Sequence, residues 1–263
     1  MTYTIIAGAR VFYYLIQRDL KNFLPNLITK VINGSLWIFL TAFVAQHILT
    51  LEGMPKTFGL LVMCANIMSW GMFEMRGQVN KLMADIKGFR TLNYFLTLPL
   101  PQWLIFVALA CAASLRSIIV AVCIFPVAKI LFWNELTLLS VAWGKFFAIF
   151  IVGNFMYGFV GLWLLSLAKD MGTVSNIWMR IVFPLWLGGG YQFTWSMLKA
   201  ASPVAAYVSL LNPLVYAYEG VRGAVLGSEG YINFWYCLGA IIVFTLLSGY
   251  FGIKRLMNQL DCL

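Results

Sequence analysis

Hydrophobic residues along this chain come in runs long enough to cross a lipid bilayer. A hydrocarbon core about 30 Å thick needs roughly 20 apolar residues in a helix that rises 1.5 Å per residue. The runs 146–167 and 232–253 carry no charged residue, and the run 104–124 carries only Arg116. This pattern predicts a membrane protein built from helices.

The long apolar pattern occurs six times, so we predict an all-α membrane protein with six transmembrane helices. The predicted spans cover residues 28–50, 57–76, 103–126, 137–168, 176–199 and 232–253. The connections are too short to hold a soluble nucleotide-binding domain, and no internal repeat divides the chain. We therefore expect a single domain over residues 1–263.

The charges support this class and orient the chain. Only 10% of the residues are charged and 62% are hydrophobic, whereas a typical soluble domain has about 25% charged residues. If the N-terminus is cytoplasmic, most basic residues fall on the inside: Arg10, Arg18, Lys21, Lys30, Arg76, Lys81, Lys87, Arg90, Lys169, Arg180, Lys254 and Arg255. Fewer fall outside: Lys56, Lys129, Lys145, Lys199 and Arg222. This asymmetry predicts a multi-pass protein of the cytoplasmic (inner) membrane with both termini cytoplasmic, and it explains the net charge of +9 without a nucleic-acid partner.

Metal and catalytic chemistry have little support. Four of the five cysteines lie in apolar runs, none forms a CxxC motif, and His47 is the single histidine. One histidine cannot build a zinc or haem site alone. Within the spans, Glu74 and Arg116 are the only candidate acid–base groups, and we interpret Glu74 with Arg76 as an interfacial ion pair. We predict no catalytic residue and no metal site.

The first 27 residues do not read as a span. Apolar residues recur at helical spacing between positions 8 and 24, while basic and amide side chains occupy the other faces. This pattern predicts an amphipathic interface helix in residues 1–27, ended by Pro25 and Asn26. The alternative is that the segment is the start of the first span.

The segment 77–102 is predicted to be a cytoplasmic loop of two short helices around a hinge at Gly88, stopped by Pro99 and Pro101. Its basic residues alternate with exposed apolar ones, which suits docking on a partner protein. The alternative is a loop embedded among the lipid headgroups.

The segment 200–231 is apolar but is interrupted by Asn212-Pro213. The interruption predicts two short helices that re-enter the membrane from the outer face. Irregular backbone at membrane depth must be covered by protein or water, so we expect this hairpin to border the protein interior or a water-filled space. Within the fifth span, Pro184 and Gly188-Gly189-Gly190 permit a kink.

Taken together, the chain resembles the membrane permease of type-2 ABC exporters over essentially its whole length. The resemblance is carried by GFRTLNYFLTLPLP (88–101), by Arg116 early in the third span, and by LLNPLVYAYEGVRGAVLG (210–227) before the last. It implies the six-span fold, the interface helix and the re-entrant hairpin. It also implies ATP-driven export by alternating access.

The resemblance assigns ATP chemistry to another polypeptide. The chain has no GxxxxGK[ST] phosphate loop, so ATP and Mg are expected in a separate ATP-binding subunit, with no cofactor in this chain. The family's coupling helix maps to about residues 88–98, and the implied contact residues are Gly88, Arg90, Thr91, Leu92 and Tyr94. Asn93 replaces an acidic residue often found there. A second permease copy, identical or related, and membrane lipids are the other expected partners.

The implied substrate path combines aromatic, polar and turn residues from the later spans and the hairpin: Arg116, Tyr157, Trp186, Tyr191, Asn212, Pro213, Glu219 and Arg222. Such aromatic faces favour an amphiphilic cargo, and the resemblance favours lipid-linked polysaccharide or glycolipid. A hydrophobic drug or antibiotic is the alternative within the family. A membrane-embedded lipid-modifying enzyme or a non-transporting structural subunit is the alternative from another class. For Arg116 itself, a structural hydrogen bond to backbone carbonyls, Asn154 or Glu219 stands equal to a role in transport.

Overall fold

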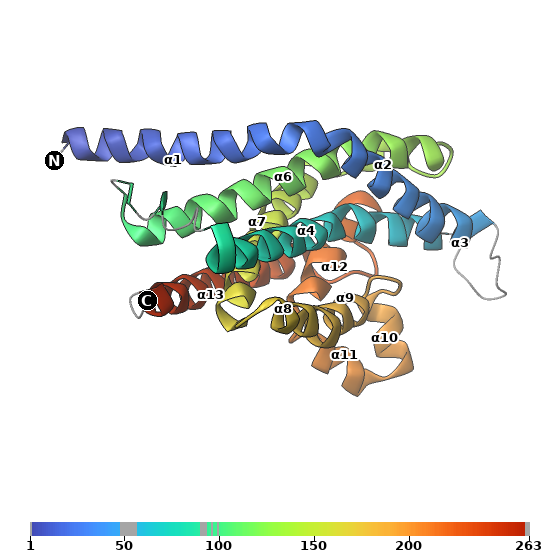
Figure 1. Cartoon of the computed structure of the whole chain (residues 1–263). Helices are drawn as coiled ribbons and strands as arrows, with labels where there is room; N and C mark the ends of the chain where they lie inside the picture. The colour runs from blue at the N-terminus through green and yellow to red at the C-terminus, as the bar shows by residue number, and fades with distance from the viewer. Residues whose placement is uncertain (1, 48–56, 90–93, 96, 99, 261–263) are drawn as a thin grey trace.

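A computed structural model describes residues 2–47, 57–89, 94–95, 97–98 and 100–260 of this chain, and all the regular elements among them are helices. Five of these helices are long and apolar enough to cross a membrane: Gly8–His47, Phe58–Ala84, Gln102–Leu131, Trp143–Leu167 and Phe234–Gln259. They contain most of five of the six predicted spans. The all-α, multi-pass character is therefore confirmed (Figure 1).

The predicted fifth span, 176–199, is not one of these long helices. Its region consists of α8 (Met171–Ile177), a π turn η5 (Trp178–Val182) and α9 (Phe183–Gly188), after which the helix ends. The end follows from the three glycines, since Gly190 has a φ of 89°, a conformation that disfavours residues with a Cβ. The count of six long spans is thus not reproduced in the described residues.

The N-terminal segment departs from the prediction at Pro25 and Asn26. Helix α1 (Thr2–Phe23) passes through a 3₁₀ turn, η1 (Leu24–Asn26), into α2 (Leu27–Ile38), a π turn η2 (Phe39–Phe43) and α3 (Val44–His47). Pro25 lies in the first turn of η1, where its missing N–H removes no helical hydrogen bond. The α-helix is therefore interrupted at the predicted place, but the helical path continues through the proline instead of stopping there.

This N-terminal helix runs beside α6 (Gln102–Leu131). Asp19 is paired with Arg116, and Gly34 packs closely against Ile124. Figure 1 shows α1 and α6 lying side by side along most of α1. The segment predicted as an interface helix therefore lies along a spanning helix, in continuity with the first span.

The core is formed by α4 (Phe58–Ala84), α6, α7 (Trp143–Leu167), α12 (Pro213–Val225) and α13 (Phe234–Leu260). Helix α4 is buried along almost its whole length because the other helices surround it. Glycines allow close helix packing where α7 meets α6 and α13: a Cβ on Gly158 would lie 2.6 Å from the Ala110 carbonyl oxygen, and one on Gly252 would lie 2.8 Å from the Trp163 backbone nitrogen.

Replacing Gly158 by Val is expected to destabilise the protein by about 1–3 kcal/mol, because the side chain forces α7 away from α6. Unfolding in detergent, followed by loss of helical circular dichroism, measures the effect. Gly239→Val in α13 is the matched control, since a Cβ there has nothing within 4 Å. Equal stability of the two variants would contradict the close packing of α6 and α7.

The segment 200–231 contains the expected pair of short helices around Asn212-Pro213. They are α11 (Pro203–Ser209) and α12, and α10 (Trp195–Ala201) precedes them. The Asn212 side chain accepts a hydrogen bond from Leu214 N at 3.1 Å and so caps α12, with Pro213 in its first turn. Entry of the pair from the outer face stays a prediction. Helix α1 begins and α13 ends at the same end of the bundle (Figure 1). Two further turns are η3 (Asp85–Phe89) and η4 (Leu138–Ser140).

Candidate functional site

Polar and aromatic side chains from several elements meet at the interface of α2, α4, α9 and α12. We call this group the polar-aromatic cluster; its members are Trp37, Thr41, Asn66, Ser69, Phe73, Trp186, Tyr191 and Tyr218. Within an apolar bundle such groups are costly unless they are hydrogen-bonded to one another. The cluster is therefore a built feature of the fold.

Tyr191, in the turn after α9, is the centre of one half of the cluster. Its hydroxyl donates to Asn66 Oδ1 at 2.7 Å and accepts from Trp37 Nε1 at 3.1 Å. Thr41 Oγ1 lies 3.2 Å from the same hydroxyl and accepts from Asn66 Nδ2 at 2.9 Å. These bonds join the first span, α4 and the turn after α9.

Trp186 is the centre of the other half. Its Nε1 donates to Ser69 Oγ at 3.0 Å, and Ser69 Oγ lies 2.8 Å from the Tyr218 hydroxyl. The Trp186 ring also packs on Tyr191, with centroids 4.3 Å apart, and on Trp37 and Phe73 at 6.4 Å each. The ring packing holds two predicted path residues, Trp186 and Tyr191, in one rigid unit.

The cluster reaches the protein surface at Trp37. Trp186 and Tyr191 are buried, whereas Trp37 is 38% exposed. The same elements carry other exposed apolar side chains: Leu36 and Leu40 on α2 and η2, and Phe183, Leu185 and Leu187 on α9. In a membrane these apolar surfaces are suited to lipid, to a second polypeptide or to an amphiphilic ligand, with the Trp37 ring exposed and its N–H bonded inward to Tyr191.

A separate apolar cavity of about 350 Å³ lies between α4, α7, α9, α12 and α13. Three predicted path residues, Tyr157, Asn212 and Pro213, line it. The Asn212 Nδ2 donates to the Leu185 carbonyl oxygen at 2.6 Å, so the start of α12 is fixed against α9. The structure thus brings these three residues together, but around a different space from the cluster.

Arg222 makes structural contacts. It is completely buried and donates to the carbonyl oxygens of Leu61, Phe193 and Tyr191 at 3.2, 2.8 and 3.0 Å. It also lies 3.6 Å from Glu219, three residues earlier on the same helix. The guanidinium therefore fastens α12 to the start of α4 and to the turn that carries Tyr191.

Glu219 also makes its hydrogen bonds with backbone groups. Its carboxylate accepts from the backbone nitrogens of Trp195 at 3.0 Å and Ile232 at 3.3 Å. Nearby, in the loop before α13, burial raises the pKa of the Tyr231 hydroxyl to about 12, so that group stays neutral at physiological pH. Glu219 and Arg222 are both bonded to backbone groups, so they position α12 against its neighbours and the turn that carries Tyr191.

Arg116 lies away from both the cluster and the cavity. Within the part of the chain that the structure describes, it contacts none of the partners predicted for it, and Asn154 is bonded to Ser117 instead. Arg116 pairs with Asp19 and donates to Gln78 Oε1 at 2.5 Å, and Glu74 lies 3.5 Å from its Nε. The predicted Glu74–Arg76 pair is also wrong, since Glu74 pairs with Lys30 and the Arg76 guanidinium lies over the Trp178 ring at 4.9 Å.

The predicted coupling residues are described only in part. Gly88 lies in η3 and is exposed, and Tyr94 is 63% exposed. Arg90, Thr91 and Leu92 lie outside the described residues. Phe95, next to Tyr94, is buried against α4 and α6, so adjacent side chains point one outward and one inward.

Three residues that matter in this geometry were missed from the sequence. Asn66 and Ser69 are polar positions three apart in an apolar run, a spacing that places them on one helix face. Asp19 is the only acidic residue before Glu52. Each signal was present, but its partner could not be inferred from the sequence alone.

Comparison with known proteins identifies the fold. The family model of the ABC-2 type transporter matches residues 10–226, which is most of the chain. Among curated proteins, a sequence search finds no match. The matched range includes the polar-aromatic cluster, the loop after α4 and α12. The chain therefore belongs to the ABC-2 type transporter family, as a multi-pass permease component.

Proposed function

We propose that this protein is the transmembrane subunit of an ATP-driven exporter that moves an amphiphilic cargo, a lipid-linked polysaccharide or glycolipid, across the cytoplasmic membrane. Family membership supports the permease role. The observation that carries the cargo class is the polar-aromatic cluster, which reaches an apolar face through Trp37. The exposed Trp37 ring suits stacking on a sugar ring or an apolar chain, and the polar groups behind it hold that ring in place.

In this proposal the conduit forms between two permease copies. Helices α2 and α9 both carry exposed apolar side chains, which a second copy can cover. The polar-aromatic cluster is rigid because its polar groups are bonded to one another. Export then requires that the cargo bind the two conformations of the dimer with different affinity, since equal affinity shifts no equilibrium.

A separate ATP-binding subunit supplies the energy, with ATP and Mg bound there. It docks on the cytoplasmic loop around Gly88 and Tyr94, and both termini lie on that side. The exposed Tyr94 beside the buried Phe95 supports a docking role, because the loop is anchored while an aromatic side chain remains free for a partner.

A hydrophobic drug or antibiotic is the second candidate cargo. The apolar cavity of about 350 Å³ beside Tyr157 and Pro213 is the observation that favours it, because a cavity of this size suits a small hydrophobic molecule.

The test is purification of the complex from native membranes, identification of its ATP-binding subunit, and reconstitution in vesicles. Glycolipid cargo is expected to stimulate ATP hydrolysis and to appear on the far side of the vesicle membrane. Stimulation by hydrophobic drugs alone would select the second candidate. A permease that purifies without an ATPase and changes the lipids chemically would overturn the proposal.

Replacing Trp37 by Ala is expected to raise the cargo concentration for half-maximal ATPase stimulation about two- to tenfold, because an aromatic contact contributes about 0.5–1.5 kcal/mol. Trp235→Ala is the matched control, since Trp235 is 68% exposed at the start of α13, where a tryptophan suits the membrane–water interface. A similar loss in both variants would argue against a role for the cluster in cargo binding.

A further inference from the structure

Five charged side chains of alternating sign form a continuous chain across four elements. We call it the charge chain, and in order its members are Lys30, Glu74, Arg116, Asp19 and Lys81. Lys30 is on α2, Glu74 and Lys81 are on α4, Arg116 is on α6 and Asp19 is on α1. Every link therefore joins two different elements.

The centre of the charge chain is buried. Asp19 is 8% exposed, Arg116 6% and Glu74 4%, and the buried Gln78 adds an acceptor for Arg116. Removing one partner of a buried ion pair leaves the other charge uncompensated, which is strongly unfavourable. Asp19, the acid between Arg116 and Lys81, therefore holds α1 against α4 and α6.

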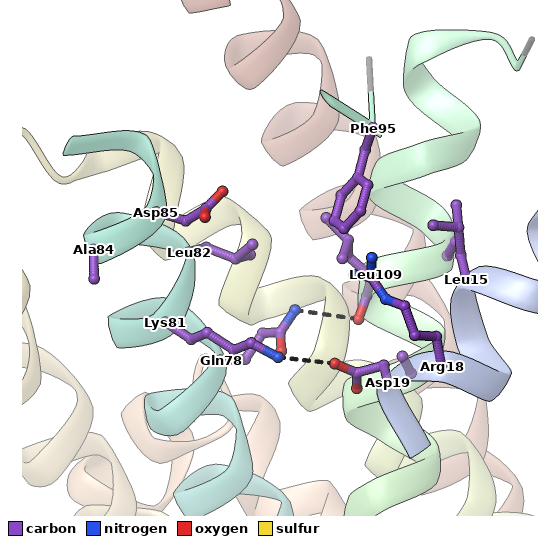
Figure 2. Close-up of a pocket in the computed structure, with 12 residues that line it drawn as sticks. Leu15, Arg18, Asp19, Gln78, Lys81, Leu82, Ala84, Asp85, Phe95 and Leu109 are labelled. Carbon is purple, nitrogen blue, oxygen red and sulfur yellow. Dashed lines mark hydrogen bonds and ion pairs between the residues drawn. The ribbon is translucent and has the colours of Figure 1, made fainter. Parts of the chain in front are cut away.

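The neighbouring residue on α1 contacts the loop after α4. The Arg18 guanidinium lies over the Phe95 ring, 4.4 Å from its centroid. Figure 2 shows Arg18 and Phe95 on one side of a cavity, with Asp19 and Lys81 joined at its base. The cavity has a volume of about 290 Å³ and is lined by both Phe95 and Asp19. The neighbouring residues Arg18 and Asp19 on α1 thus connect Phe95 with Arg116 and Lys81.

We infer that Arg18 and Asp19 are positioning residues. Through α1 they transmit to the spans the movement of the predicted cytoplasmic loop that follows α4, which we call the coupling loop. Arg18 fastens α1 to the loop at Phe95, and Asp19 fastens the same turn of α1 to Arg116. A displacement of the loop by the ATPase then moves α1, and with it α4 and α6. This inference rests on the proposed function for its transport readout, but the mechanical link is measurable on the permease alone.

The first experiment uses the permease alone in detergent. Hydrogen exchange of the backbone amides in residues 82–98 is measured for the native chain, Asp19→Asn and Arg18→Gln. Both variants are expected to exchange several-fold faster in this segment. Glu135→Gln is the control, because Glu135 carries an exposed charge beyond the far end of α6, where His47 lies 3.4 Å away. Unchanged exchange in both variants would overturn the link, whatever the protein transports.

The second experiment measures cargo moved per ATP hydrolysed in the reconstituted complex. Each single variant is expected to lower this ratio three- to tenfold, while Asp19→Glu keeps most of it. Because the two residues act in series, Arg18→Gln with Asp19→Asn is expected to lose no more than the worse single variant. If the two substitutions lower stability additively and leave the cargo moved per ATP unchanged, the residues have only a structural role and the inference is overturned. A native complex without ATP-driven transport refutes the proposed function instead and leaves the exchange result to decide the link.

Discussion

Replacing Arg222 by Met is expected to destabilise the protein by about 3–5 kcal/mol, the largest change in stability for any single residue described above. The guanidinium is completely buried, so three backbone carbonyls and the Glu219 carboxylate lose their partner together. The turn that carries Tyr191 is released at the same time. Thermal unfolding in detergent, with helical circular dichroism as the signal, measures the effect.

Two further variants make this test specific. Lys199→Met removes an exposed cation whose ammonium lies 5.0 Å from the centroid of the Trp195 ring, and it is expected to change stability by less than about 1 kcal/mol. Glu219→Gln combined with Arg222→Met is expected to recover part of the loss, since no unpaired carboxylate is then buried. If Arg222→Met unfolds at the same temperature as Lys199→Met, the carbonyl contacts contribute nothing.

Replacing Tyr94 by Ala is expected to weaken binding of the ATP-binding subunit by about thirtyfold or more, because exposed aromatic side chains at interfaces commonly contribute at least 2 kcal/mol. The stability of the permease itself should not change, because Tyr94 is 63% exposed. Titration of the purified subunit against the permease in nanodiscs measures the affinity. Tyr207→Ala in α11, also an exposed tyrosine, is the control. Binding as tight as that of the native chain would place the docking surface elsewhere.

The long spans could be predicted because length and hydropathy alone define them. Helices α4, α6, α7 and α13 all occupy apolar runs that the bilayer thickness requires. Two local rules misled the prediction elsewhere. Pro25 reads as a helix end, yet a proline in a first turn costs no hydrogen bond. The run 176–199 is long enough to span, but three successive glycines end the helix at Gly188.

The contacts of the site were harder to predict than the site residues. Trp186 and Tyr191 were selected from the sequence, but their partners were not, because a helix that is apolar on all sides gives no signal for which face meets which neighbour. Asn66 lies 125 positions from Tyr191 and Asp19 lies 97 from Arg116. Such pairs are set by how the helices rotate against each other, so Arg116 was given the wrong partners.

The continuity of the N-terminal helix sets how far this protein extends beyond the bilayer. The 40 residues from Gly8 to His47 follow a helical path that bends between α1 and α2 (Figure 1) and is about 60 Å long, roughly twice the thickness of the hydrocarbon core. A tilt of 40° would use only about 26 of those residues within the core. The rest must stand in headgroups or water at the end where α13 also finishes (Figure 1). A label attached near the start of α1 would therefore lie outside the hydrocarbon core, on the side where the proposed ATP-binding subunit is expected to dock.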